Sequence, residues 1–105
     1  MAKWVGFITR RENLTPEEFL AHWTGPHAAI ASRLPKLRGY SINLLPENSG
    51  IGWDGFVELW FDSDEDLLAA LASDVMKVEL PLDRPKFIGR MISVAAQEYP
   101  IIEMR

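Results

Sequence analysis

The sequence predicts an α+β domain in which two strand–helix–strand units share one antiparallel sheet. Four segments are rich in β-branched and aromatic residues, and two segments between them have helix caps followed by apolar residues at helical spacing. The 105 residues suffice for one domain, which we expect to span residues 1–105. This order is typical of the ferredoxin-like βαββαβ sandwich, whose four-stranded sheet carries its helices on one face. A doubly wound parallel sheet usually has a glycine-rich turn after its first strand, and residues 9–12 contain no glycine.

The first strand is predicted over residues 3–10, where aromatic and β-branched side chains dominate. A charged turn ends it, and a helix start follows at Thr15, whose hydroxyl is a good N-cap. Pro16 suits the first helical position, and Glu18 stands three residues after Thr15, as in a capping box. These residues predict a helix that begins here.

One apolar stripe continues this helix at about 100° per residue. Its members are Phe19, Trp23, Ile30 and Leu34. Gly25 and Pro26 interrupt the stripe. Because Pro26 lacks an N–H and biases its predecessor away from helix, we expect a kink or a restart at this point. Pro35 follows the last member of the stripe and closes the helical region.

The second half of the chain repeats this order. Strands are predicted over residues 38–45 and 55–61, joined by a loop rich in proline, asparagine and glycine. Ser63 then caps a helix with an acidic first turn, and a further turn or two is expected through Val78. Two later prolines argue against a long regular helix, and the last strand is predicted over residues 91–99.

The strand over residues 55–61 is apolar on both faces. The alternation of side chains puts Phe56 and Trp60 on one side and three apolar residues on the other. Helices can cover only one face of a four-stranded sheet, so a second copy of the chain is the simplest cover for the other. We therefore expect a homodimer in which two sheets pair into an α+β barrel.

Charge and cysteine content exclude several classes of function. The chain has 11 basic and 15 acidic residues, a net charge of −4 and no basic run, which argues against nucleic-acid and anionic-membrane partners. It has no cysteine, which excludes disulfides, thiol catalysis and cysteine-based metal sites. No segment approaches the about 20 apolar residues of a membrane helix, and no signal-peptide pattern is present. We expect a cytoplasmic protein without a metal or an organic cofactor.

His27 is the first candidate for chemistry. It lies one helical turn after Trp23, just past the break at Gly25 and Pro26. An imidazole titrates near neutral pH, so His27 could donate and accept a proton, or it could be a structural histidine that ties the break to a carbonyl. His22 is expected at the surface. We reject a metal site formed by the two histidines, because residues five apart do not share an α-helical face.

Other candidates lie on the two middle strands. Tyr40 offers a phenol that could orient a ligand oxygen, although an ordinary half-buried tyrosine explains it equally well. Glu58 stands in an apolar strand, where it is either a base beside a pocket or half of a salt bridge. The partners considered for that salt bridge are Arg10, Arg38 and Arg90. The expected apolar walls of the pocket are Trp23, Leu59 and Trp60.

Two motifs resemble the EthD family. The first is Phe19-x-x-x-Trp23-x-x-x-His27-Ala28 with Leu34-Pro35-x-Leu37-x-x-Tyr40, and the second is the run over residues 58–63 before an acidic helix start. Segments of the last third are similar to bacterial methylmuconolactone methylisomerase, a relative. The resemblance covers nearly the whole chain and implies a dimeric α+β barrel. It also implies a pocket between helices and sheet, with His27 and Tyr40 as its catalytic residues.

The resemblance narrows the expected function to a superfamily of isomerases, cyclases, small monooxygenases and haem-degrading enzymes. The isomerase has a cysteine where this chain has Leu59, so an identical reaction is not expected. We expect a cofactor-independent isomerase, lyase or cyclase of a catabolic or secondary-metabolite pathway. Its substrate would be small, hydrophobic and oxygenated, such as a lactone or a phenol. The alternatives are a non-catalytic ligand-binding accessory protein for an oxygenase system, and a cofactor-free monooxygenase.

Overall fold

The computed structural model describes residues 1–103. The strands are β1 (Ala2–Arg10), β2 (Gly39–Leu44), β3 (Gly55–Phe61) and β4 (Ile88–Gln97). The first helical region consists of α1 (Pro16–His22), the π-helical turn η1 (Trp23–His27) and α2 (Ala28–Ala31). The second consists of α3 (Asp64–Leu71), the π-helical turn η2 (Val75–Glu79), α4 (Leu80–Asp83) and the 3-10 turn η3 (Arg84–Lys86).

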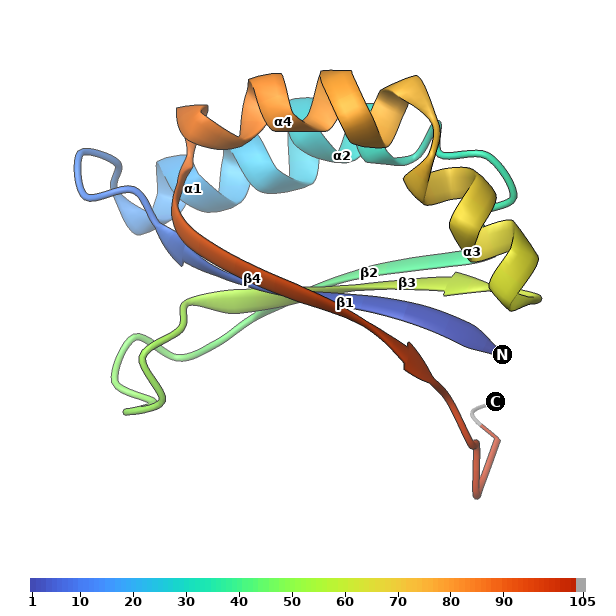
Figure 1. Cartoon of the computed structure of the whole chain (residues 1–105). Coiled ribbons are helices and arrows are strands. Elements are labelled where there is room, and N and C mark those ends of the chain that lie inside the picture. The colour runs from blue at the N-terminus through green and yellow to red at the C-terminus, as the bar shows by residue number, and fades with distance from the viewer. Residues whose placement is uncertain (104–105) are drawn as a thin grey trace.

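The strands form one antiparallel sheet in the order β2-β3-β1-β4. Both helical regions lie on the same face of this sheet, and the twisted sheet runs beneath them (Figure 1). We call the face under the helices the inner face and the opposite one the outer face. This arrangement confirms the predicted α+β, ferredoxin-like fold.

The first helical region begins at the predicted cap. Thr15 accepts a hydrogen bond from the N–H of Glu18, whose carboxylate accepts one from the N–H of Thr15 at 2.8 Å. Instead of restarting at Pro26, the chain continues through η1, where the N–H of Ala28 reaches the carbonyl of Trp23. This wide turn accommodates a proline that has no N–H to donate. It also changes the angular spacing of the side chains that flank it.

The second helical region is longer than predicted. The sequence predicts an end near Val78, but the chain stays helical through α4 and η3. Pro81 and Pro85 each stand in the first two positions of a new turn, where a missing N–H loses no bond within that turn. The prolines therefore divide the region into short segments without ending it, and they carry Asp83 and Arg84 over the sheet.

The last strand also begins earlier than predicted, at Ile88 instead of Met91. Gly89 is the second residue of this strand. A Cβ at this position would lie only 2.9 Å from Oγ1 of Thr9, so glycine is what allows β4 to approach β1. Gly89 is thus a point where β4 lies close to β1.

Two clusters of buried side chains join the helices to the inner face. The smaller one contains Trp23, Phe19 and Phe87, each of them 2% exposed or less. A Cβ at Gly55 would lie 2.6 Å from the Trp23 ring, so the indole rests directly on the backbone of β3. This contact fixes the height of η1 above the sheet, and with it the position of His27.

Candidate functional site

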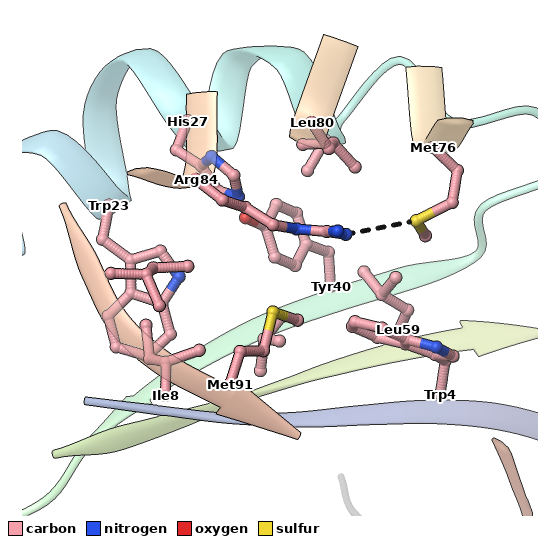
Figure 2. A pocket seen from close by; sticks show the side chains of 13 residues that line it. Trp4, Ile8, Trp23, His27, Tyr40, Leu59, Met76, Leu80, Arg84 and Met91 are labelled. Carbon is pink, nitrogen blue, oxygen red and sulfur yellow. Dashed lines mark hydrogen bonds between the residues drawn. The ribbon is translucent and has the colours of Figure 1, made fainter. Parts of the chain in front are cut away.

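A small cavity of about 30 Å³ lies between the helices and the inner face (Figure 2). Its lining comes from both helical regions and from all four strands. The lining side chains are Trp4, Ile8, Trp23, His27, Ala31, Tyr40, Val57, Leu59, Met76, Leu80, Arg84, Ile88 and Met91. Most are apolar, and the titratable groups among them are His27, Tyr40 and Arg84. The cavity is therefore apolar, with three titratable side chains in its lining.

The two histidines bind the same carboxylate oxygen. Oδ2 of Asp83 lies 2.9 Å from Nε2 of His22 and 2.8 Å from Nδ1 of His27. Residues five apart diverge on an α-helix, so the two histidines were expected on different sides of the helix. The π-helical turn η1 has more residues per turn, so it brings both rings to the side that faces α4. The expectation of a separate, surface-facing His22 was wrong for this reason.

Asp83 sets the protonation of the His27 ring. Burial raises the pKa of Asp83, but hydrogen bonds from His22 and His27 outweigh it and bring that pKa below its ordinary value. The ionised carboxylate accepts from each ring, which assigns the His27 proton to Nδ1 and leaves Nε2 unprotonated. Burial also lowers the pKa of His27, although the contact with Asp83 opposes this shift. The ring is therefore neutral at neutral pH and has a free lone pair.

Phe87 packs against both imidazoles. Its fully buried ring lies 4.9 Å from the ring of His22 and 4.7 Å from that of His27, measured between centroids. Nζ of Lys86 lies 3.6 Å from Oδ1 of Asp83, on the other oxygen of that carboxylate. Because His27 is only 8% exposed, these neighbours hold its ring in one orientation, with Nε2 as the nitrogen not engaged by Asp83.

Tyr40 reaches the same cavity from β2. Its hydroxyl points toward the side of the cavity that holds His27 and Arg84 (Figure 2). Burial raises the pKa of this phenol to about 12, so it stays protonated at neutral pH. Tyr40 is therefore a hydrogen-bond donor for an oxygen atom in the cavity.

The predicted residues of β3 point to opposite faces of the sheet. Leu59 lines the cavity, as does Trp23 from η1, whereas Glu58 and Trp60 are not part of the lining. Successive side chains on a strand alternate, so the two neighbours of Leu59 lie on the outer face. The structure does not bring Glu58 and Trp60 to the other candidate residues.

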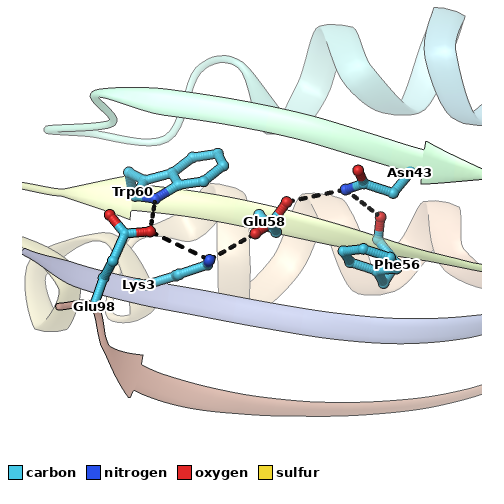
Figure 3. A network of polar contacts seen from close by, with 6 residues as sticks. All are labelled: Lys3, Asn43, Phe56, Glu58, Trp60 and Glu98. Carbon is cyan, nitrogen blue, oxygen red and sulfur yellow. Dashed lines mark hydrogen bonds and ion pairs between the residues drawn. The ribbon is translucent and has the colours of Figure 1, made fainter. Parts of the chain in front are cut away.

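Glu58 belongs to a polar network on the outer face (Figure 3). Its carboxylate lies 2.6 Å from Nζ of Lys3 and accepts a hydrogen bond from Asn43 at 3.1 Å. Glu98 accepts a hydrogen bond from Nε1 of Trp60 at 2.9 Å and lies 3.4 Å from Nζ of Lys3. The salt bridge of Glu58 is present, but its predicted partners were wrong. Lys3 pairs with Trp60 in the β1–β3 register, which brings it next to Glu58.

The EthD domain profile matches residues 11–90. The chain belongs to the EthD family. The matched region runs from the turn before α1 into β4, so it includes both histidines and Asp83. A search of curated proteins finds no significant match to this EthD chain.

Solved structures similar to this EthD protein share its fold. An EthD-family protein from Bacillus halodurans is 22% identical, with a TM-score of 0.78 over 94% of this chain and 99% of that chain. A dimeric ferredoxin-like protein from Thermobifida fusca is 10% identical, with a TM-score of 0.70 over 90% of this chain and 88% of that chain. SnoaB, a cofactor-independent oxygenase from Streptomyces nogalater, is 12% identical, with a TM-score of 0.69 over 92% of this chain and 91% of that chain.

Sequence reasoning missed two residues of this EthD site, Asp83 and Arg84. They stand between Pro81 and Pro85, and the prolines were interpreted as the end of the helical region. Proline is favourable at the first position of a helix, and that preference was the signal available for this segment. The contact of Asp83 with His27 spans 56 residues of sequence, so no local pattern predicts it.

The side chains of the candidate site that could ligate a metal ion bind one another instead: His22 and His27 both contact Asp83. Within residues 1–103, no group of three His, Asp or Glu side chains is arranged to hold a metal ion. The ring nitrogens that face Asp83 carry protons and donate them, so they offer no lone pair in that direction.

No helix in the described part of the chain has the length and apolar character needed to cross a bilayer.

Proposed function

We propose that this EthD protein is a cofactor-independent isomerase or lyase that moves a proton on a small hydrophobic, oxygenated molecule. The observation that carries the proposal is the geometry of His27. Its Nδ1 is held 2.8 Å from the buried Asp83, and its neutral ring lines an apolar cavity. A carboxylate behind an imidazole is the arrangement that orients a histidine as a proton acceptor.

The chemistry needs only side chains of this chain. Nε2 of His27 would take a proton from a carbon next to a carbonyl, and the electron pair of that C–H bond would form an enolate. The O–H of Tyr40 would donate a hydrogen bond to the enolate oxygen, as its high pKa allows. The imidazolium would then return the proton to another carbon, which completes an isomerisation without net oxidation.

Substrate entry requires the cavity to enlarge. A cavity of about 30 Å³ has room for a few water molecules at most, which is too little for a lactone or a phenol. Met76 and Met91 form part of the wall, and methionine side chains change shape at low cost. These two residues are the part of the lining that we expect to move.

The test uses α-angelica lactone in D2O, followed by proton NMR. This lactone carries acidic hydrogens between its carbonyl and its double bond, and their transfer gives the conjugated isomer. The protein should accelerate isomerisation over buffer, and His27→Gln should reduce that acceleration by at least about 100-fold. His22→Gln is the matched control and should lose less than about tenfold. A rate equal to the buffer rate, or an unchanged rate in His27→Gln, would contradict the proposal.

A second candidate function is ligand binding without conversion, as an accessory protein of an oxygenase system. The small number of groups able to exchange protons near neutral pH favours it, since Tyr40 stays protonated and His27 is the one base among the described lining residues. A ligand that raises the melting temperature and is recovered unchanged after long incubation would support it. SnoaB, which has the same fold, is a cofactor-independent oxygenase, so oxygen uptake with a quinol would test that third candidate.

The outer face supports a homodimer. Ile92 and Val94 on β4 are 57% and 61% exposed there, beside the partly exposed Phe7 and Phe56. Similar structures include a dimeric protein from Thermobifida fusca. Light scattering at micromolar concentration should give about twice the chain mass, and Val94→Lys should shift the protein toward a monomer. A cytoplasmic location remains part of this proposal.

A further inference from the structure

A cationic side chain enters the cavity without a carboxylate beside it. Arg84 begins η3, and its guanidinium extends across the cavity toward Met76 (Figure 2). One of its terminal nitrogens donates to Sδ of Met76 at 3.5 Å, and a thioether is a weak acceptor. No Asp or Glu is among the lining residues, and within residues 1–103 Arg84 takes part in no ion pair.

The neighbours of Arg84 are engaged elsewhere. Asp83, the adjacent carboxylate, already contacts both histidines and Lys86. Two exposed arginines form ion pairs with carboxylates: Arg33 pairs with Glu79, and Arg38 pairs with Asp62. The other three arginines in the described part of the chain, Arg10, Arg11 and Arg90, have no ion pair there, but each donates to a backbone carbonyl. Arg84 is half-buried and donates only to a thioether, and a weakly paired charge costs more free energy there than at the surface. Burial alone lowers the pKa of Arg84 from its usual value, which reflects this cost.

We infer that Arg84 binds the carboxylate group of a small organic anion, so that the ligand of this cavity is an unsaturated or aromatic carboxylic acid. A guanidinium offers two parallel N–H groups that match the two oxygens of a carboxylate. The apolar remainder of the lining suits the hydrocarbon part of such a molecule. This ligand class is assigned to the proposed active site, and it depends on the proposed function only for the choice of this cavity as the site.

A bound carboxylate would also act on the catalytic imidazole. The charge of Arg84 is one of the factors that lower the pKa of His27. Because an anion on the guanidinium would offset that charge, it would raise the pKa of His27 toward its ordinary value. The ligand would thereby make Nε2 a stronger base in the complex than in the free protein.

The test compares benzoate with benzamide, which has the same shape and no charge. Binding is followed by calorimetry and by the fluorescence of Trp4 and Trp23, which line the cavity. The parent protein should bind benzoate at least about tenfold more tightly than benzamide. Arg84→Met should remove that difference, and Arg84→Lys should retain part of it. Equal binding of the two probes by the parent, or binding of neither, would overturn the inference.

Two controls separate the possible causes. Arg90→Met removes the same charge from an exposed arginine that packs over Trp53, and it should keep the preference for benzoate. Arg84→Met should melt no lower than the parent, since it removes an unpaired charge from an apolar site. A preference that survives in Arg84→Met would also overturn the inference. His27→Gln should keep the preference, so loss of isomerisation and loss of anion binding can be told apart.

Discussion

Polar side chains pair with one another on the outer face of the sheet, whereas on the inner face some of them are left facing a cavity. On the outer face, Lys3, Glu58 and Glu98 pair with one another and with Trp60. On the inner face, Asp83 holds the histidines from behind, and the remaining polar groups point into an apolar cavity. Polar groups that satisfy each other need no ligand, whereas groups fixed on one side and open on the other are prepared to bind one.

Two consecutive residues of β3 make this contrast clear. Glu58 attracted attention in the sequence as a charged group in an apolar strand, yet its charge is neutralised by Lys3 on the outer face. Leu59 has no reactive group, but it lies on the wall of the cavity and is 3% exposed. The unusual residue thus lies away from the cavity, so the side of the sheet, and not the residue type, decides which residue of β3 lines it.

The largest expected effect is on the inner face, at Asp83. Asp83→Asn keeps an oxygen that can accept from both imidazoles, but it removes the negative charge that strengthens these two hydrogen bonds and attracts Lys86. The free energy of unfolding should fall by about 2–3 kcal/mol in urea denaturation. The matched control Asp62→Asn disturbs an exposed ion pair with Arg38 and should change it by less than about 0.5 kcal/mol. Equal losses in the two variants would remove the distinction between a held and an exposed carboxylate.

A smaller effect is expected on the outer face, at Glu58. Glu58→Gln keeps an acceptor for Asn43 but removes the charge beside Lys3, so it should cost about 1 kcal/mol. That loss should shrink only partly in 1 M salt, because the side chains of Lys3 and Glu58 are 18% and 19% exposed and a partly buried pair is screened less than an exposed one. Glu12→Gln, in an exposed turn, serves as the control, and all variants are measured at one protein concentration. A loss at Glu58 as large as that at Asp83 would mean that both faces depend on charge equally.

The smallest effect concerns pH. The pKa of His27 is lower in the folded chain than its ordinary value of 6.5, so the unfolded chain binds more protons in that range. The free energy of unfolding should therefore fall as the pH drops from about 7.5 to about 5.5. Asp83 also has a lowered pKa and adds its own loss only at more acidic pH, below about 3.8. His27→Gln should flatten the profile in the first range, and an unchanged slope would assign it to another group.

The fold could be predicted from the sequence more completely than the candidate site could. Thr15 and Ser63 correctly predicted where the two helical regions begin, because an N-cap depends on residues only three positions apart. His27, Tyr40, Trp23 and Leu59 were chosen from local spacing and resemblance, and all four line one cavity. The placement of Glu58 and Trp60 failed, since a pocket residue on β3 must share the face of Leu59. Asp83 and Arg84 were missed because their importance comes from contacts with distant segments.

The sequence alone determined the order of elements, the antiparallel α+β class and the helix caps, because these depend on periodicity and on neighbours a few residues apart. Only the tertiary structure decided which polar groups meet. The π-helical turn η1 rotates His22 and His27 onto one side, and the helical path past Pro81 delivers Asp83 to them. These are long-range consequences of packing two helical regions on one sheet, which no single stretch of sequence encodes.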